Sequence, residues 1–339
     1  MQKQNIIGRT EEELREFCRE RGFKEFHGTQ LFNWIYHRYP GNFSDMTDLP
    51  MQLRQELEEH YYLGYLYSYR RDESRGRDAT KYGFVLKDGK RIEAVVLTDK
   101  TGRVSFCISS QVGCALGCTY CETGKIGFIR NLSASEILAQ VLTLRHLHGN
   151  PQSVLFMGMG EPLMNYAAVV DSLKLLQAVG VGPRKITIST CGIVKRIYDL
   201  AGAGLNVRLA LSMGSAIDDK RKKLIPVSNH NSLSQLKKAL IYYRQRTKRR
   251  ASIEYILIGG VNDTREEALA LVRFAKETWG HVNLIRYNPI KGSRLTVPSS
   301  DEVNEFIRIL QVHGIEVSER YRRGQDIAAA CGQLVAGYR

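Results

Sequence analysis

Residues 103–122 read RVSFCISSQVGCALGCTYCE, and this stretch decides the fold. Its first part, residues 103–109, alternates apolar and polar side chains as a β-strand does. Three cysteines follow at close spacing, namely Cys114, Cys118 and Cys121. Gly113, just before the first cysteine, and Gly117, between the first two, let the backbone curl, so the thiols can face one centre. The stretch therefore predicts a strand that leads directly into a loop of clustered thiols.

The same order of a β-rich run and a helical run recurs six times in the chain. The expected strands cover residues 103–109, 153–158, 185–190, 206–212, 252–258 and 282–287. The expected helices cover about residues 134–148, 166–179, 194–203, 232–246, 264–278 and 301–312. Ser133 and Glu136 have the spacing of a capping box at the start of the first helix. Six β-α units predict parallel strands with right-handed crossovers, either as a barrel-like wall or as an open doubly wound sheet.

The first hundred residues have a different pattern. Residues 11–60 carry apolar side chains at helical spacing. Residues 79–98 alternate in strand fashion around Asp88-Gly89, which predicts a hairpin turn. We expect an N-terminal accessory domain over residues 1–100. A second domain over residues 101–339 would then hold the β-α units and the C-terminal segment.

Composition narrows the class of protein. The chain has 339 residues, 43% of them hydrophobic, which excludes disordered and collagen-like classes. No apolar run approaches the ~18 residues of a membrane span, and the start of the chain turns charged at once. We therefore expect a cytoplasmic protein whose cysteines are free thiols. A net charge of +14 favours a polyanionic partner, with nucleic acid as the first choice and solubility alone as the alternative explanation. The basic runs are Arg70 to Arg77, Lys220 to Lys223, Arg244 to Arg250, and Arg320 with Arg322 and Arg323.

The three clustered cysteines form the pattern C-x3-C-x2-C. A structural zinc site needs four ligands, and no further Cys or His lies close by in the sequence. Three thiolates suit a four-iron cluster that keeps one iron open for a substrate or cofactor. Zinc is the second interpretation, and three inert buried thiols are the third.

This cysteine pattern in the first β-α loop resembles the hallmark of radical S-adenosylmethionine (SAM) enzymes. The wider set of motifs resembles the RlmN/Cfr family of RNA adenine methyltransferases. The matching segments are FHGTQLFNWIY, CISSQVGCALGCTYCETGKIGFIRNL, GMGEPLMNY, ISTCG, IEYILIGGVND, NLIRYNP and GQDIAAACGQL. The resemblance implies an α/β fold with a partial (βα)6 TIM-like radical SAM barrel and a small N-terminal helical and β-hairpin domain. It also implies a [4Fe-4S] cluster on Cys114, Cys118 and Cys121. The implied contacts to SAM are Gly160, Glu161, Ser189, Ser212, Met213, Gly214 and Asn288.

The resemblance also implies roles for three residues in catalysis. Cys331 takes a methyl group from one SAM molecule, and a second SAM is cleaved reductively to a deoxyadenosyl radical. That radical removes hydrogen from the methylated sulfur group, and the resulting carbon radical adds to an adenine ring carbon. Cys107 attacks the sulfur of Cys331, which releases the adduct and leaves a disulfide bond. Glu93 is the general base that removes the ring proton.

The implied substrates are 23S ribosomal RNA and also transfer RNA, with carbon 2 of adenine favoured over carbon 8. The implied partners are the RNA and an electron donor such as flavodoxin or ferredoxin, and we expect a monomer. Two segments depart from the family pattern: SMGS at 212–215 replaces Ser-Leu-His-Ala, and Arg286 stands where proline is usual. These departures leave open a radical SAM paralogue that acts on another substrate. The non-enzyme alternative is a zinc-stabilised RNA-binding protein without activity.

Overall fold

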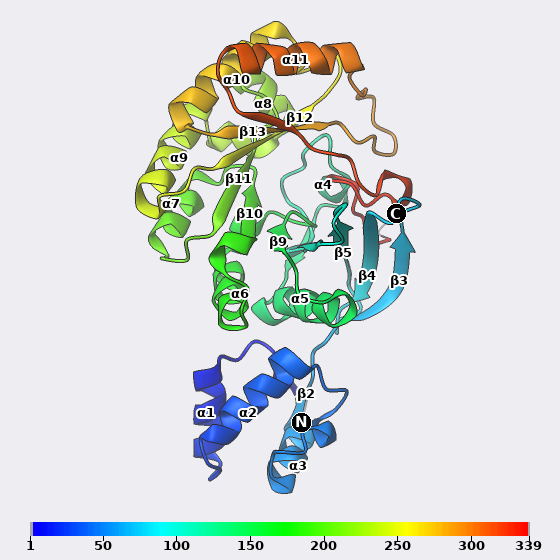
Figure 1. The fold of residues 1–339 in the computed structure, drawn as a ribbon, viewed down its shortest axis with the longest axis vertical. Helices are drawn as coiled ribbons and strands as arrows, with labels where there is room; N and C mark the ends of the chain where they lie inside the picture. The colour runs from blue at the N-terminus through cyan, green and yellow to red at the C-terminus, as the bar shows by residue number, and fades with distance from the viewer. Residues whose placement is uncertain (1–2, 338–339) are drawn as a thin grey trace.

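The structure, a computed structural model, describes residues 3–337. The first part of the chain forms a helical group that stands below the rest in Figure 1. Its helices are α1 (Glu11–Glu20), α2 (Phe26–Asn33) and α3 (Met51–His60). Strand β1 (Gln4–Asn5) pairs in parallel with β2 (Tyr61–Tyr62), which closes this group on itself. Within the described residues, no helix is long and apolar enough to cross a membrane.

Residues 3–337 also form a ten-stranded sheet with the order β14-β13-β12-β11-β10-β9-β6-β5-β4-β3. Its parallel strands are β6 (Val104–Cys107), β9 (Ser153–Phe156), β10 (Ile186–Thr190), β11 (Arg208–Ser212), β12 (Ser252–Leu257), β13 (His281–Arg286) and β14 (Val317–Glu319). Each of these strands pairs with the next one along the chain. Such an order is that of a barrel wall wound in one direction, because a doubly wound sheet reverses its strand order. The predicted partial barrel is thus confirmed, with β14 added beyond the six predicted strands.

The predicted helices cover the outer face of this wall (Figure 1). They are α5 (Ala134–His148), α6 (Tyr166–Ala178), α7 (Val194–Gly202), α9 (Leu233–Thr247), α10 (Arg265–Thr278) and α11 (Ser300–Val312). Two short helices, α4 (Glu122–Ile126) and α8 (Asp218–Leu224), were not predicted and lie in loops. Helix α5 also joins the barrel to the N-terminal helices, because the Thr143 and Tyr39 hydroxyls lie 3.1 Å apart.

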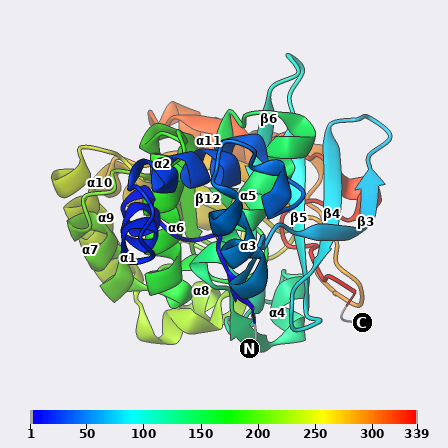
Figure 2. The same ribbon diagram turned by 90° about the horizontal axis from the view of Figure 1, so that it is seen from below.

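Three antiparallel strands extend the sheet beyond β6. They are β3 (Tyr67–Glu73), β4 (Ala79–Val85) and β5 (Arg91–Thr98), and they lie side by side in Figure 2. The turn at Asp88-Gly89 joins β4 to β5 as predicted, and Gly89 has a φ of 76° that favours glycine. Val95 of β5 pairs with Cys107 of β6, so the sheet continues across residue 100.

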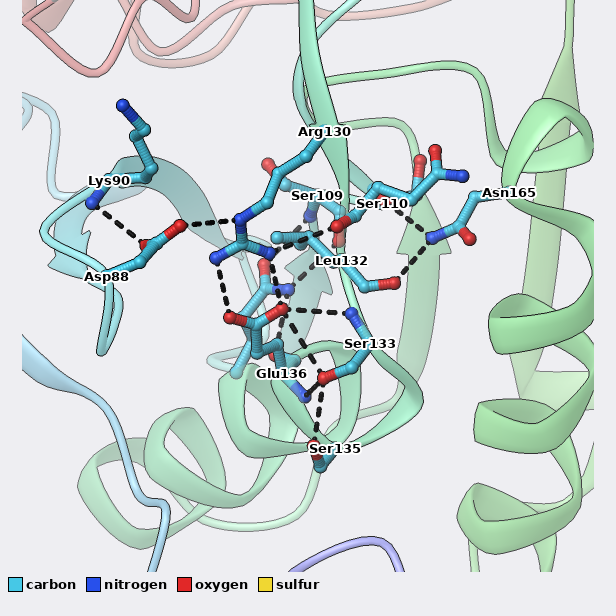
Figure 3. Close-up of polar contacts among 12 residues, drawn as sticks. Asp88, Lys90, Ser109, Ser110, Arg130, Leu132, Ser133, Ser135, Glu136 and Asn165 are labelled. Atoms are coloured by element: carbon cyan, nitrogen blue, oxygen red, sulfur yellow. Dashed lines mark hydrogen bonds and ion pairs between the residues drawn. The ribbon is translucent and has the colours of Figure 1, made fainter. Parts of the chain in front are cut away.

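Arg130 fixes the hairpin turn to the barrel (Figure 3). It lies on β8 (Phe128–Asn131), and its Nε donates to Asp88 at 2.7 Å. Its two terminal nitrogens donate to the carboxylate of Glu136 at 2.8 and 2.9 Å. The carboxylates of Glu136 and Asp88 raise the pKa of the Arg130 guanidinium. Glu136 also completes the predicted capping box with Ser133, so the hairpin, β8 and the start of α5 are held as one unit.

Candidate active site

A cavity of about 420 Å³ opens at one end of the parallel strands. Its wall contains residues at the carboxyl ends of four neighbouring strands: Cys107 of β6, Phe156 of β9, Thr190 of β10 and Ser212 of β11. Ligands of barrel folds bind at this end of the strands. The fold therefore gathers the loops that follow the strands around one hollow.

Most of the residues singled out from the sequence line this cavity. The ten that do are Cys107, Cys114, Cys118, Cys121, Gly160, Glu161, Ser189, Ser212, Asn288 and Cys331. Three others lie outside the lining. Met213 is fully buried, and its amide donates to the carbonyl oxygen of Glu254 at 2.9 Å. The Gly214 carbonyl oxygen accepts a hydrogen bond from the Asn262 side chain at 2.6 Å. The third residue outside the lining is Glu93.

The cysteine loop is shaped by a close approach of two backbone segments. Gly113 has a φ of 74°, and a Cβ atom there would lie 1.9 Å from the carbonyl oxygen of Gly127. The amide of Cys114 donates to that same oxygen at 2.9 Å. Only glycine fits at position 113, and the chain turns there into the cavity. Burial raises the pKa of the Cys114 thiol to about 12, so a bound metal would have to displace its proton.

A fourth cysteine and a buried cation lie beside this loop. The Sγ atoms of Cys118 and Cys191 are 3.8 Å apart. Arg221 on α8 is 0% exposed, and its Nη2 donates to the carbonyl oxygen of Cys191 at 2.6 Å. Its Nε and Nη1, like the Tyr120 hydroxyl, have no hydrogen-bond partner among residues 3–337. A buried guanidinium with unpaired N–H groups is costly unless an anion lies close to it.

These features fit an iron–sulfur cluster. The thiolates of a cluster would supply the negative charge that Arg221 lacks. No group of three or more His, Cys, Asp or Glu side chains in the described chain is arranged to hold a single metal ion. A [4Fe-4S] cluster does not need such an arrangement, because each of its cysteines binds a different iron.

Sequence reasoning placed Arg221 only in a basic run. Its three- and four-residue spacing to the buried Leu224 and Ile225 was the signal that it faces inward.

Glu161 provides a carboxylate in the cavity wall. It is 2% exposed, and it accepts hydrogen bonds from the amides of Cys191 at 2.8 Å and Leu163 at 3.0 Å. Burial raises the pKa of this carboxyl to about 7, against those two hydrogen bonds. The preceding Gly160 has a φ of 98°, and a Cβ there would lie 2.5 Å from Gln111. A buried carboxylate reached past a glycine fits the ammonium group of SAM.

Cys107 and Cys331 come from distant parts of the chain to the same cavity. Both are free thiols, and no disulfide occurs anywhere in the described residues, so the structure does not support the expected disulfide between them. Burial raises the pKa of Cys107, and the nearby Cys331 raises it further. Cys331 is exposed at the cavity surface; desolvation there still raises the pKa of its thiol, whereas Arg320 lowers it. Arg320 lines the cavity with its Nε 3.2 Å from Glu254, a contact that the sequence did not reveal.

Glu93 lies behind the C-terminal segment rather than in the cavity lining. Its Oε2 accepts a hydrogen bond from the amide of Val335 at 2.8 Å. Its Oε1 lies 3.6 Å from Nζ of Lys81, a buried lysine on β4. Sequence reasoning missed Lys81, because a lysine in an alternating strand normally points to solvent.

The departure at Arg286 has a structural partner. Its Nε donates to Glu319 on β14 at 2.6 Å, and its Nη1 donates to Ser300 at the start of α11 at 3.2 Å. Arg286 does not line the cavity. The substitution thus stabilises the last strand and helix of the barrel and leaves the candidate site unchanged.

Comparisons with known proteins agree with this arrangement. Residues 108–274 match the Radical SAM superfamily, and residues 4–63 match the ribosomal RNA large subunit methyltransferase N-terminal domain. The chain is 40% identical over 338 residues to the probable dual-specificity RNA methyltransferase RlmN of Clostridium beijerinckii, covering 98% of this chain and 95% of the relative. It is 39% identical over 345 residues to the protein of the same name from Clostridioides difficile, covering all of both chains. The crystal structure of a radical SAM methyltransferase from Sphaerobacter thermophilus superposes with a TM-score of 0.93 and 37% identity, covering 98% of this chain and 99% of that one. The chain therefore belongs to the RlmN family of radical SAM RNA methyltransferases.

Proposed function

We propose that this protein methylates a ring carbon of adenine in RNA, with carbon 2 favoured over carbon 8. One observation carries the proposal: Cys107 and Cys331 line the same cavity as the three clustered cysteines. An aromatic C–H carbon is not nucleophilic enough to take a methyl cation equivalent directly. Radical chemistry at the cluster and a sulfur that carries the methyl group would solve this problem within one cavity.

The cofactors would be held by the residues that line the cavity. Cys114, Cys118 and Cys121 would ligate the [4Fe-4S] cluster, and Glu161 would bind the ammonium group of SAM. Further SAM contacts would come from Ser189 and Ser212, whose hydroxyls lie 3.3 Å apart, and from Gly160 and Asn288. When bound, these cofactors supply the methyl group and the one-electron chemistry. Met213 and Gly214 could contribute only through a backbone rearrangement, because neither lines the cavity.

The chain's own residues would perform the remaining steps. The Cys331 thiolate accepts the methyl group and carries it to the base. Glu93 would accept the proton from the adenine ring carbon after a shift of the C-terminal segment, because it lies behind that segment and does not line the cavity. The Cys107 thiolate then attacks the sulfur of Cys331 and an S–S bond forms. The S–C bond of the adduct breaks, its electron pair passes to the methylene carbon on adenine, and that carbon takes up a proton from solvent to become the methyl group. A cellular dithiol would reduce the resulting disulfide before the next turnover.

RNA would reach the cavity across a basic rim. Tyr321 lines the cavity, is 77% exposed and stands beside Arg322 and Arg323, which also line it. Arginines bind phosphates, and an exposed tyrosine offers a face on which a base can stack.

We propose 23S ribosomal RNA and transfer RNA as substrates, since the named relatives are called dual-specificity RNA methyltransferases. Residues 1–100 would help to bind the RNA in the cytoplasm, with flavodoxin or ferredoxin as electron donor and a monomer as the working form.

The test compares modified nucleosides in RNA treated with anaerobically reconstituted protein. We expect 2-methyladenosine by mass spectrometry, and its loss with Cys331→Ala or Cys118→Ala. Only Cys118→Ala should also lose iron–sulfur absorbance. Appearance of 8-methyladenosine would correct the ring position. If deletion of the gene removed no methyladenosine from cellular RNA, a paralogue with another substrate would be favoured. One zinc per chain without iron would favour the inactive RNA-binding protein.

A further inference from the structure

The C-terminal segment that carries Cys331 is held at both ends by one buried ion pair. We call residues 328–336 the tail segment. At its start, Nζ of Lys81 donates to the carbonyl oxygen of Ala328 at 3.3 Å. Near its end, the amide of Val335 donates to Oε2 of Glu93 at 2.8 Å. The Lys81 and Glu93 side chains are 5% and 4% exposed, and Nζ lies 3.6 Å from Oε1.

The two contacts lie beside strained backbone. Ala328 has a φ of 49° and Ala336 a φ of 51°, which is the left-handed region. A residue other than glycine is strained in this region. Lys81 binds Ala328 itself, and Glu93 binds the residue before Ala336. The ends of the tail segment would relax without contacts from the rest of the protein, and the ion pair supplies those contacts.

The middle of the tail segment is hydrogen-bonded to the loops that would hold the cofactors. The Gly332 carbonyl oxygen accepts a hydrogen bond from the amide of Glu122, the residue after Cys121, at 2.7 Å. The Cys331 carbonyl oxygen accepts one from Asn288 at 3.2 Å. Cys331 thus sits between a hairpin that grips the ends of its segment and loops that would hold the cofactors.

We propose that Lys81 is a positioning residue: together with Glu93 it clamps the two ends of the tail segment and keeps Cys331 in the cavity. The clamp rests on the function proposed above. The other charged groups around the pair are Asp72, whose Oδ2 lies 3.9 Å from Nζ of Lys81, and Arg70, which binds Asp72.

Cys331 is exposed, so the test measures the rate of hydrogen–deuterium exchange at the Val335 amide, which Glu93 holds, in protein without RNA. We expect Lys81→Met to raise this rate on the order of tenfold, because removing one partner of a buried pair leaves the other charge unpaired. Lys81→Arg, which keeps the charge, should restore a rate close to that of the native protein. Lys90→Met, at an exposed lysine on the same hairpin, is the matched control and should change nothing.

A double variant tests whether Lys81 and Glu93 act together. Glu93→Gln keeps an oxygen that can accept from the Val335 amide but removes the charge, and it should also raise the exchange rate. Lys81→Met combined with Glu93→Gln should exchange no faster than the faster single variant. Multiplicative effects of the two substitutions on the exchange rate, or a native exchange rate in Lys81→Met, would overturn the clamp. If Lys81→Met does not fold, Glu93→Gln alone decides: a native exchange rate in that variant overturns the proposal.

This measurement is separate from RNA methylation. If the protein methylated no adenine but the exchange rates followed the expected pattern, the clamp would stand and the proposed function would fail. If RNA methylation occurred but Lys81→Met left the exchange rate of the Val335 amide native, the reverse would hold.

Discussion

The sulfur atoms of Cys118 and Cys191 lie 3.8 Å apart at the edge of the candidate cluster site. Cys191 follows β10 directly, and its amide is fixed by Glu161. A disulfide bond is about 2.05 Å long, so a small side-chain rotation would bring these sulfurs together. A proposed cluster ligand and a second thiol are thus neighbours.

We predict that cluster-free protein exposed to air forms a Cys118–Cys191 disulfide, with oxygen taking the two electrons and two protons. The disulfide removes a cluster ligand, so iron loading should fall until a reductant is added. Cys191→Ser should load iron without reductant. Peptide mapping by mass spectrometry and the iron content after reconstitution check both results. Cys18→Ser is the control, because Cys18 is buried in α1 of the N-terminal helices. A native protein that stays fully reduced in air would contradict this prediction.

Arg221→Met should lower the reduction potential of the reconstituted cluster. The buried guanidinium favours the more negative, reduced state of the cluster. Its loss should therefore shift the potential downward on the order of 60 mV, which is about a tenfold change in the equilibrium constant of a one-electron reduction. A redox titration followed by electron paramagnetic resonance measures this shift. Arg221→Lys should recover part of it. Lys223→Met, at an exposed residue of the same helix, should leave the potential unchanged. An unchanged potential in Arg221→Met would show that the guanidinium does not act on the cluster.

SAM binding should tighten as pH rises through about 7. Glu161 has its pKa raised to about 7 in the SAM-free protein by burial, and an ammonium ligand needs its ionised form. Binding should therefore be about tenfold weaker at pH 6 than at pH 8. Anaerobic calorimetry with reconstituted protein measures the affinity. Glu161→Gln should bind weakly with a flat pH profile between these values, and a steep profile in that variant would assign the titration to another group.

The raised pKa of Glu161 also predicts how the stability of SAM-free protein depends on pH. A carboxyl whose pKa is raised on folding favours the folded state below its unfolded value of about 4.5, and this contribution is lost as pH rises through about 7. The contribution of Glu161 is on the order of 3 kcal/mol. Urea unfolding at pH 5 and pH 8 should show a smaller pH dependence in Glu161→Gln than in the native chain.

Ser133→Ala should lower the free energy of unfolding by about 1 kcal/mol. It removes the side-chain acceptor for the amide of Glu136, which also anchors Arg130 and the hairpin turn. Urea unfolding measures the change. Ser234→Ala, at an exposed first-turn position of α9, is the control and should be close to neutral. A loss in the control as large as that in Ser133→Ala would argue against a specific effect of the cap.

The sequence predicted the barrel because each strand and helix carries its own periodicity. The long helix α5 begins at the predicted capping box, and the turn at Asp88-Gly89 lies where expected. Helices α4 and α8 were missed because each is short and lies in a loop that reads as a motif or a charge run. The pairing of β5 with β6 was also missed, since no local pattern shows which strands become neighbours.

The site was predicted where residues share a motif, and missed where burial alone gives a residue its role. The three clustered cysteines and Gly160-Glu161 belong to short motifs that can be read directly. The contact between Glu93 and Val335 joins positions 242 residues apart and left no local trace. Lys81 and Arg221 looked like surface cations, because only tertiary packing decides that a lysine or arginine is buried.

The continuation of the sheet past β6 has a consequence for solubility. A barrel cut at residue 100 would expose the unpaired edge of β6, which carries the buried Phe106 and Cys107. Bare strand edges invite pairing with other molecules and aggregation. In the intact chain the free edge is β3 instead, and it bears exposed charges such as Arg70 and Arg71 that oppose such pairing. The hairpin strands therefore protect the barrel from self-association as well as supplying Glu93.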